Sequence, residues 1–261
     1  MVVVQLNSRH TSSLMNNIIV MLNTFMQNTF EFEAIGYIRS PYKQKFAIPR
    51  QPGLIPEAKA QLVFHESFSA EPFIRGIEEF SHLWLLFVFH ETADKGWSPM
   101  VRPPRLGGNI RKGVFATRAT FRPNPIGLSV VQLEGVRVTG KQVELDLAGI
   151  DLLDGTPILD IKPYLPYSDA IPHAAASFAD SAPETSMTVS FSEQVLEFCQ
   201  SQLQYPQLQT FIEKVLKQDP RPPYKKKQIG EQSYGMTLYN FNIQWTVTGE
   251  HHYVYAITTL P

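Results

Sequence analysis

Short apolar segments separated by turn residues recur along the chain from residue 30 to residue 167. Residues 128–138 and 141–147 flank Thr139-Gly140, and a glycine at such a short turn predicts a β-hairpin. The run from His82 to His90 is apolar between its two histidines, which predicts a strand buried on both faces. Several short strands joined by turns indicate a closed or strongly curved sheet, so we predict a β-barrel over residues 30–167. Its strands are expected at 32–38, 82–90, 113–118, 128–138, 141–147 and 158–165.

The periodicity of the last part of the chain is that of helices followed by a hairpin. Ser192 can cap a helix that runs through Leu203, and Pro206 can open a second helix that stops at Asp219-Pro220. Residues 236–247 and 253–257 alternate around Thr248-Gly249-Glu250 as a terminal hairpin. We therefore predict a mainly β protein with an α+β C-terminal part, a small helix-and-hairpin domain at 187–261. The apolar stripe of its second helix is expected at Leu208, Phe211, Ile212, Val215 and Leu216.

Two segments lie outside the predicted elements. Residues 168–186 are small and polar and contain two prolines, which predicts a linker or a long ordered loop. Residues 1–29 contain a rather apolar stretch at 14–26, but asparagines interrupt it and no small-residue cleavage site follows, so a secretory signal is not favoured. We expect a loosely ordered extension there, or a start upstream of the true initiator, and leave it out of the fold. The candidate initiators are Met15, Met21 and Met26.

Net charge and cysteine content exclude several classes of protein. The 261 residues include 23 basic and 24 acidic ones, which excludes a uniformly basic nucleic-acid coat but not a local basic patch. Cys199 is the only cysteine and is expected in a helix core, so an intrachain disulfide and a cysteine-rich metal site are excluded. No apolar run approaches the roughly 20 residues of a membrane span. A cytoplasmic location without a membrane span is therefore expected.

Positive charge is concentrated between Lys95 and Gln132, where seven cations occur without a carboxylate. The alternative to a binding surface is an ordinary solvated face. Several of these arginines, however, lie among proline, glycine and asparagine in rigid loops, where phosphate or carboxylate is the natural partner of a guanidinium group. The segment therefore predicts a binding surface for a polyanion. Its cations are Lys95, Arg102, Arg105, Arg111, Lys112, Arg118 and Arg122.

A second basic cluster follows the last predicted helix, at Arg221–Lys227. Tyr224 could stack on a base there, while the neighbouring cations follow phosphates. A solvated lysine run is the alternative interpretation. The candidate nucleic-acid contacts are Arg122, Arg221, Tyr224, Lys225, Lys226 and Lys227.

Motifs of several common enzyme classes are absent from the sequence. Gly107-Gly108-Asn109 fits neither the dinucleotide-binding nor the Walker pattern, and neither a zinc-protease motif nor a nucleophile elbow is found. His82 and His90 would lie roughly 26 Å apart on one strand, so they cannot bind one metal ion. We therefore expect no metal site. His90 is a candidate site residue, with a structural histidine as the alternative.

Polar groups gather at two predicted strand ends, in Asp151–Pro157 and around Asp160. Asp154-Gly155 is a plausible turn by itself. Asp160 and Lys162 alternate with apolar neighbours and so share one strand face, where a charge inside a small barrel would need a partner.

Seven segments occur together along the chain, and the C-terminal segment Asp219–Tyr224 follows them. The seven are Phe46–Gly53, His82–His90, Val101–Asn109, Gly113–Arg118, Phe121–Gly127, Asp151–Pro157 and Asp160–Tyr164. In these residues and in their order the chain resembles the TrmO family of tRNA N6-methyltransferases, over about residues 30–261. The segments are long enough to make coincidence implausible.

The resemblance implies an S-adenosylmethionine-dependent β-barrel enzyme that acts as a homodimer. It implies methylation of N6 of threonylcarbamoyladenosine at position 37 of tRNA, next to the anticodon. Glu91 departs from the family pattern, so its backbone is expected to matter more than its side chain. The cofactor-binding residues that the resemblance implies are Pro49, Arg50, Gln51, His90, Glu91, Arg118, Leu128, Asp154, Gly155, Thr156 and Pro157.

The chemistry of the expected reaction makes further demands on the chain. Transfer of a methyl group is an in-line displacement that depends on positioning, and Asn124 between two prolines could hold the acceptor nitrogen. Closing a turn is the alternative role for Asn124. The acceptor must also lose a proton, and Asp160 and His90 are the candidate bases. A non-catalytic RNA-binding module and a metal-dependent phosphoester hydrolase are the alternative functions; a cofactor-binding assay and metal dependence separate them.

Overall fold

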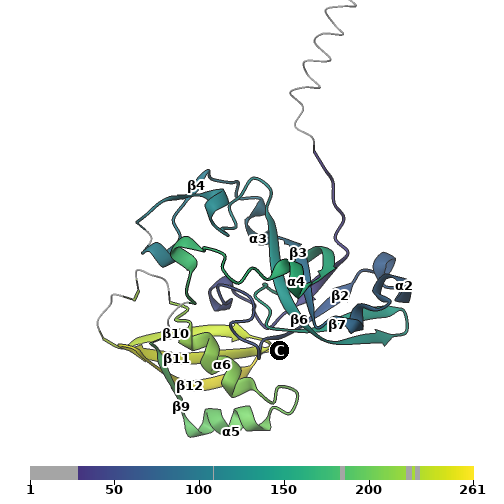
Figure 1. Cartoon of the computed structure of the whole chain (residues 1–261). Coiled ribbons are helices and arrows are strands. Elements are labelled where there is room, and N and C mark those ends of the chain that lie inside the picture. Colours follow the sequence, from purple (N-terminus) through teal and green to yellow (C-terminus); the bar gives the residue numbers. More distant parts are fainter. Residues whose placement is uncertain (1–28, 108, 183–185, 222–224, 227–229) are drawn as a thin grey trace, which may run out of the picture. The chain divides into compact units, whose positions relative to one another are not determined.

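The computed structural model describes residues 29–107, 109–182, 186–221, 225–226 and 230–261 (Figure 1). Residues 34–261 form one compact unit, and the described residues 29–33 belong to a separate one. The expected N-terminal extension lies outside the described residues, apart from Thr29. The fold below is that of residues 34–261.

A closed antiparallel barrel forms the first half of this unit, which confirms the predicted fold class. Its strands are hydrogen-bonded in the order β1-β2-β7-β6-β3-β8, and β8 closes back onto β1. Closure pairs every strand on both sides and leaves no exposed edge. The strands are β1 (Gly36–Arg39), β2 (Lys59–Phe64), β3 (His82–Val88), β6 (Ile126–Thr139), β7 (Gln142–Ala148) and β8 (Pro157–Pro163).

Strand β3 alternates between the barrel interior and its outer surface. Leu83, Leu85 and Phe87 are buried, whereas His82 is exposed and Trp84 is half-buried. The prediction of a strand buried on both faces is therefore wrong. An apolar run in an antiparallel barrel turns only every second residue inward, because successive side chains point to opposite faces.

Three other strand predictions also needed correction. Regular pairing begins at Gly36 rather than at residue 32. The predicted strand at 113–118 is only Lys112–Gly113 (β5), which pairs with Met100–Val101 (β4) and is followed by a 3₁₀ turn at 114–116. Strand β2 was not predicted: it is short, and the inward residues of its first half include the small Ala60.

A four-stranded sheet with two helices forms the C-terminal part. The sheet order is β10-β11-β12-β9, with β9 parallel to β12. The predicted terminal hairpin is in fact three strands, because the chain turns at Tyr239-Asn240, where Tyr239 adopts a φ of 54°. The elements are β9 (Thr188–Phe191), α5 (Glu193–Ser201), α6 (Leu208–Lys217), β10 (Gln232–Leu238), β11 (Phe241–Thr248) and β12 (His251–Thr259).

Both helix predictions are confirmed. The Ser192 side chain accepts a hydrogen bond from the backbone N–H of Val195 at 3.3 Å, which is the contact expected of an N-cap. Cys199 is buried on α5, and burial raises the pKa of its thiol to about 11. All five residues of the predicted apolar stripe of α6 are buried.

The remaining elements are short. Helices α2 (Glu71–Ile74), α3 (His90–Ala93) and α4 (Pro166–Asp169) each form about one turn. In the predicted linker or long loop, described residues lie in α4 and in a 3₁₀ turn at 177–179, and nearly all of them are exposed. Other 3₁₀ turns occur at 45–47, 66–68, 77–79 and 104–106.

One hydrophobic core extends through the barrel and the C-terminal part. Tyr42, which follows β1, is fully buried, forms a β-bridge with Leu238 and packs its ring against Phe211 of α6 at a centroid distance of 5.8 Å. Lys214 of α6 also pairs with Glu57 at 2.5 Å. The segment after β1 therefore links the two parts through apolar, backbone and ionic contacts.

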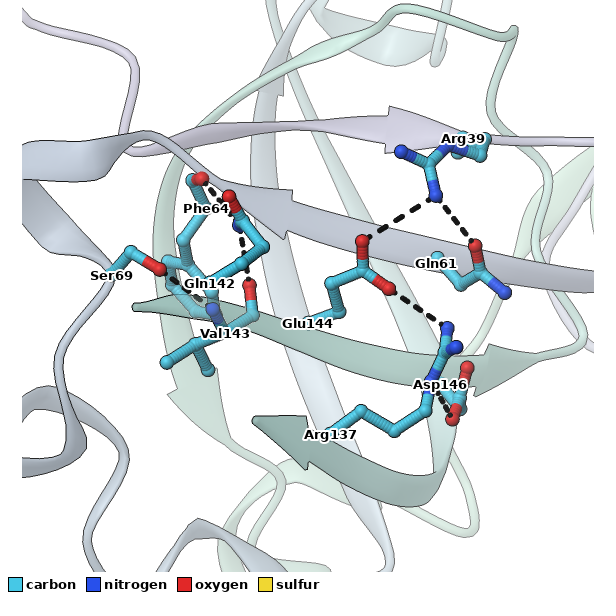
Figure 2. Close-up of polar contacts among 9 residues, drawn as sticks. All are labelled: Arg39, Gln61, Phe64, Ser69, Arg137, Gln142, Val143, Glu144 and Asp146. Carbon is cyan, nitrogen blue, oxygen red and sulfur yellow. Dashed lines mark hydrogen bonds and ion pairs between the residues drawn. The ribbon is translucent and has the colours of Figure 1, made fainter. Parts of the chain in front are cut away.

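Charged side chains on the outer face of the barrel pair with one another (Figure 2). Glu144 of β7 forms salt bridges with Arg39 of β1 at 3.4 Å and with Arg137 of β6 at 2.9 Å. Arg137 forms a further salt bridge with Asp146 of β7 at 2.8 Å. Arg39 donates a further hydrogen bond to Gln61 of β2 at 3.1 Å. Positive and negative side chains on this face of the barrel are therefore largely paired with one another.

Candidate active site

The predicted site residues gather at one end of the barrel. The carboxyl ends of β1, β3 and β7 meet there with the amino ends of β2, β6 and β8, as the antiparallel pairing requires. The connections at this end are therefore residues 40–58, 89–125 and 149–156. These three loops contain most of the residues that the resemblance implied.

Gln51 and Arg118 come together from two of these loops. The Arg118 guanidinium donates a hydrogen bond to Oε1 of Gln51 at 2.5 Å. Arg118 is exposed, and Gln51 is half-buried. The hydrogen bond to Gln51 orients the accessible guanidinium group of Arg118. An oriented guanidinium group suits a ligand carboxylate or phosphate.

Asp151 adds a half-buried carboxylate from the third loop. The hydroxyl of Ser129, a fully buried residue of β6, donates a hydrogen bond to Oδ1 of Asp151. Burial raises the pKa of Asp151 to about 6, although the Ser129 hydrogen bond and the charge of Arg118 oppose the shift. A cation and a carboxylate of altered pKa therefore lie together at this end of the barrel.

Helix α3 is attached to the loop that carries Gln51. Lys45 pairs with the Glu91 carboxylate at 3.4 Å and also donates to the Glu91 backbone carbonyl at 3.4 Å. His90, the first residue of α3, is half-buried. In the same loop as Lys45, Pro49 is buried and Arg50 is exposed.

The turn at 154–157 is held mainly by its own protein contacts. The Asp154 carboxylate accepts the backbone N–H of Ser40 at 2.8 Å and pairs with Lys43 at 2.7 Å. Gly155 adopts a φ of 76°, which favours glycine, and the Thr156 hydroxyl donates to the Leu153 carbonyl at 2.7 Å. This confirms the predicted turn and assigns the Asp154 side chain a structural role.

Asn124 closes a tight backbone turn at the start of β6. Its carbonyl accepts the N–H of Ile126 at 2.7 Å, and the Pro125 carbonyl accepts the N–H of Phe89 at 2.8 Å. The Asn124 residue itself is exposed. Its backbone therefore serves the turn, while its side chain lies at the surface of the same loop.

Other predicted residues lie along the neighbouring strands and loops. Leu128 is 53% exposed on β6. Asp160 on β8 pairs with Lys162 at 2.8 Å, and its other oxygen accepts the Ile161 N–H at 2.9 Å. Arg122 donates to the Ala119 carbonyl of its own loop at 3.1 Å. Asp160 and Lys162 thus share a strand face, as predicted, but that face is partly solvated rather than inside the barrel, and the two side chains pair with each other.

The C-terminal basic cluster is only partly described, because Tyr224 and Lys227 lie outside the described residues. Arg221 is buried and holds Asp219 through two hydrogen bonds, at 2.7 and 3.1 Å. Lys226 also pairs with Asp219, at 2.9 Å. Burial opposes ionisation of Asp219, but the hydrogen bonds from Arg221 and Lys226 lower its pKa. Arg221 is thus a buried residue that holds Asp219 in place through hydrogen bonds.

The cations between Lys95 and Arg122 differ from those on the barrel wall. Within the described part of the chain, none of these seven side chains pairs with a carboxylate within 4 Å. Arg105 instead donates to the Ser181 backbone carbonyl and hydroxyl. Because these cations have no carboxylate partner among the described residues, the segment that carries Arg118 is positively charged.

Two of these site residues were not selected from the sequence, Asp151 and Ser129. Asp151 belongs to a motif that was recognised, but only its partners Asp154–Pro157 were assigned to the site. The signal that could have found Asp151 is a carboxylate directly before two leucines at a strand end. Ser129 carried no such signal, because its neighbours on β6 are apolar.

A search for metal sites and membrane spans covered only the described residues. Among them, no group of three or more histidine, cysteine, aspartate or glutamate side chains could hold a metal ion. None of the helices in the described ranges has the length and apolar character needed to cross a bilayer.

Comparisons with known proteins agree with this fold. The tRNA-methyltransferase O N-terminal domain model matches residues 37–170, and the TrmO C-terminal domain model matches residues 184–260. The tRNA (adenine(37)-N6)-methyltransferase of Escherichia coli K12 is 52% identical over 231 residues, which cover 88% of this chain and 98% of that protein. The human protein of the same name is 38% identical over 64% of this chain and 38% of its own length. A crystal structure of TrmO from Pseudomonas aeruginosa superposes with a TM-score of 0.72 and 40% identity, covering 88% of this chain and 99% of that one.

The closed barrel, the loops at its site end and the two matching domain models define a tRNA methyltransferase of the β-barrel class. The chain belongs to the TrmO family.

Proposed function

We propose that the protein transfers a methyl group from S-adenosylmethionine to N6 of adenine 37 of tRNA, with threonylcarbamoyladenosine as the acceptor nucleoside. The observation that carries the proposal is the convergence of Gln51, Arg118 and Asp151 at one end of the barrel. The E. coli relative, named tRNA (adenine(37)-N6)-methyltransferase, supports it over nearly its whole length.

The residues at the barrel end fit the chemical groups of S-adenosylmethionine. That molecule has one carboxylate and one sulfonium cation, and it supplies the activated methyl group when bound. Arg118, oriented by Gln51, offers a cation to the carboxylate, and Asp151 offers negative charge near the sulfonium. Arg50, His90, Glu91 and Leu128 remain proposed contacts of this ligand.

Two other predicted contributions fit a site at this end of the barrel. Asn124 is proposed to hold the acceptor nitrogen through its side chain, because its backbone carbonyl already serves the turn. The cations of residues 95–122, most of which are exposed, are proposed to follow tRNA phosphates, joined by Lys225 and Lys226 beyond α6. Arg221 is buried and is proposed to support this segment through Asp219 rather than to contact tRNA directly.

The domain division and assembly are also proposals. Residues 187–261 form the tRNA-associated domain and residues 168–186 connect it to the barrel; the two family models, at 37–170 and 184–260, support this division. Exposed apolar side chains near the site, among them Trp97, Phe115 and Phe121, support a homodimer because such residues favour association. Sedimentation equilibrium measures the assembly, and the proposed location is the cytoplasm.

Nucleoside mass spectrometry tests the proposed reaction. The purified protein, S-adenosylmethionine and tRNA from a strain that lacks the methylation should yield N6-methylated threonylcarbamoyladenosine. A transcript with unmodified adenine 37 is the matched acceptor and should stay unmethylated. Equal methylation of both would restrict the proposal to adenine, and methylation of neither would contradict it. Calorimetric binding of S-adenosylmethionine separates the methyltransferase from a simple RNA-binding module or a hydrolase.

A further inference from the structure

The proposed reaction needs a proton acceptor at the barrel end. The exocyclic nitrogen of adenine carries hydrogen, so a methyl group can replace it only if one proton leaves. Asp151 shares the barrel end with Arg118 and Gln51, whereas Asp160 on β8 is paired with Lys162. We propose that Asp151 accepts the N6 proton during methyl transfer, an inference that rests on the proposed function.

The atoms, electrons and charges of this step balance without a further reactant. The N6–H bond breaks and its proton goes to a carboxylate oxygen of Asp151. The electron pair of that nitrogen forms the bond to the methyl carbon, while the carbon–sulfur pair stays on sulfur as that bond breaks. The sulfonium cation and the carboxylate anion become neutral together, and Asp151 later returns its proton to solvent.

The surroundings of Asp151 suit a base that works near neutral pH. Burial weakens the preference for the ionised form, which makes the carboxylate a stronger proton acceptor than an exposed aspartate. The Ser129 hydroxyl and the positive charge of Arg118 oppose this, and they keep the group ionised at neutral pH. The phenol of Tyr42 also interacts with this carboxylate, and burial raises the pKa of that phenol well above its usual value, so Tyr42 is neutral.

Asp151→Asn is the decisive variant, because asparagine keeps the shape but cannot accept the proton. We expect kcat at saturating S-adenosylmethionine to fall about 100-fold or more, the range in which general bases contribute. Cofactor affinity should fall as well, because the variant also loses the negative charge proposed to lie near the sulfonium, and saturation keeps that loss out of kcat. Asp146→Asn is the matched control: it removes a carboxylate of the neighbouring strand β7 that pairs with Arg137 on the outer face. Its turnover should stay within about twofold of wild type.

Ser129→Ala provides a second readout, in the pH profile. The acidic limb of kcat/KM should lie near pH 6 in the wild type and move to higher pH in the variant, because the carboxylate loses a donor that stabilises it. NMR titration of the Asp151 carboxyl in protein without substrates should show the same displacement. If the NMR titration moves and the kinetic limb does not, Asp151 is not the base.

Thermal unfolding distinguishes a catalytic role from a structural one. A carboxyl whose pKa is raised by folding stabilises the native state only below its unfolded pKa, and this contribution is lost as pH rises through the folded value near 6. Asp151→Asn should therefore melt several degrees higher than wild type at pH 8 and about equally near pH 4. A variant that is more stable yet inactive supports the proposal.

Three results would overturn the proposal. These are normal turnover of Asp151→Asn, normal kcat at saturating S-adenosylmethionine with weakened binding, and a loss of activity explained by unfolding at pH 8. Wild-type protein runs in the same assay, so a wild type that fails to methylate tRNA contradicts the proposed function instead.

Discussion

Arg118 and Asp151 illustrate how differently two charged residues of one site can be read from the sequence. Arg118 stood out because it lies in a carboxylate-free stretch with rigid loops on both sides. Asp151 did not, because its altered pKa depends on burial and on Ser129, which lies 22 residues earlier in another strand. Desolvation is a property of the folded surroundings, so local sequence does not reveal it.

Replacing Arg118 tests the anionic end of the cofactor site. Arg118→Ala should weaken S-adenosylmethionine binding about 10-fold or more, because a charge-assisted hydrogen bond to the ligand carboxylate is lost. Its melting temperature should stay close to that of wild type, since Arg118 is exposed and bonds only Gln51 among the contacts described. Titration calorimetry measures the affinity. Unchanged affinity would remove Arg118 from the site.

Replacing Asn124 tests the positioning of the acceptor. Asn124→Ala should lose roughly 100-fold in turnover, because a misplaced acceptor forfeits much of the advantage of orientation. Cofactor affinity should not change. Single-turnover kinetics with saturating tRNA measures the effect. Normal turnover would eliminate the positioning role, and an unfolded variant would show that the Asn124 side chain supports the turn, since alanine keeps the backbone carbonyl that closes it.

At the scale of elements, strong periodicity predicted helices well and short strands poorly. The stripe of α6 and the Ser192 cap were found because one face of a helix repeats over several turns. Strand β2 and the two-residue strands β4 and β5 were missed or misplaced because they are too short to show a period of two. The turn at Tyr239-Asn240 also lacks the glycine that usually marks a positive φ.

His252 of β12 makes the C-terminal sheet sensitive to acid. It is fully buried, and neither ring nitrogen has a hydrogen-bond partner among the described residues. Burial lowers the pKa of His252 to about 4; Arg221, His251 and Lys226 add to this, while Asp219 opposes it. Between pH 6.5 and pH 4, His252 is therefore protonated in the unfolded chain but neutral in the folded one. The free energy of unfolding falls as pH falls through this range.

His252→Leu should remove this sensitivity. The wild type is expected to lose about 2 kcal/mol of unfolding free energy between pH 7.5 and pH 5 through His252 alone. The variant should lose correspondingly less. Urea unfolding at the two pH values measures the difference. Equal losses in the two proteins would show that His252 is protonated in the folded state.

At the scale of the whole molecule, charge is distributed unevenly. The barrel wall pairs its charges across β1, β7 and β6 (Figure 2), whereas the cations of residues 95–122 have no carboxylate partners among the described residues. A net charge of −1 conceals this contrast. The basic segment could be predicted from the sequence because its cations lie close together along the chain. The paired charges of the barrel wall could not, because their pairing depends on the register of neighbouring strands.

The second basic cluster should contribute to tRNA affinity alone. Replacing Lys225, Lys226 and Lys227 with alanine should raise the KM for tRNA several-fold and flatten its salt dependence, because fewer counterions are released on binding. S-adenosylmethionine affinity should not change. Initial rates at several salt concentrations measure the slope. An unchanged slope would show that the three lysines do not contact tRNA phosphates.

The shared core around Tyr42 limits how the enzyme can move. Because Tyr42 is buried and joins Leu238 and Phe211, swinging the C-terminal sheet away from the barrel would expose apolar surface and break a backbone bridge. Hinged domain closure around the substrate is therefore costly for this chain. Capture and release of an anticodon arm must instead come from the loops at the barrel end, and turnover should respond to changes in those loops rather than to a hinge.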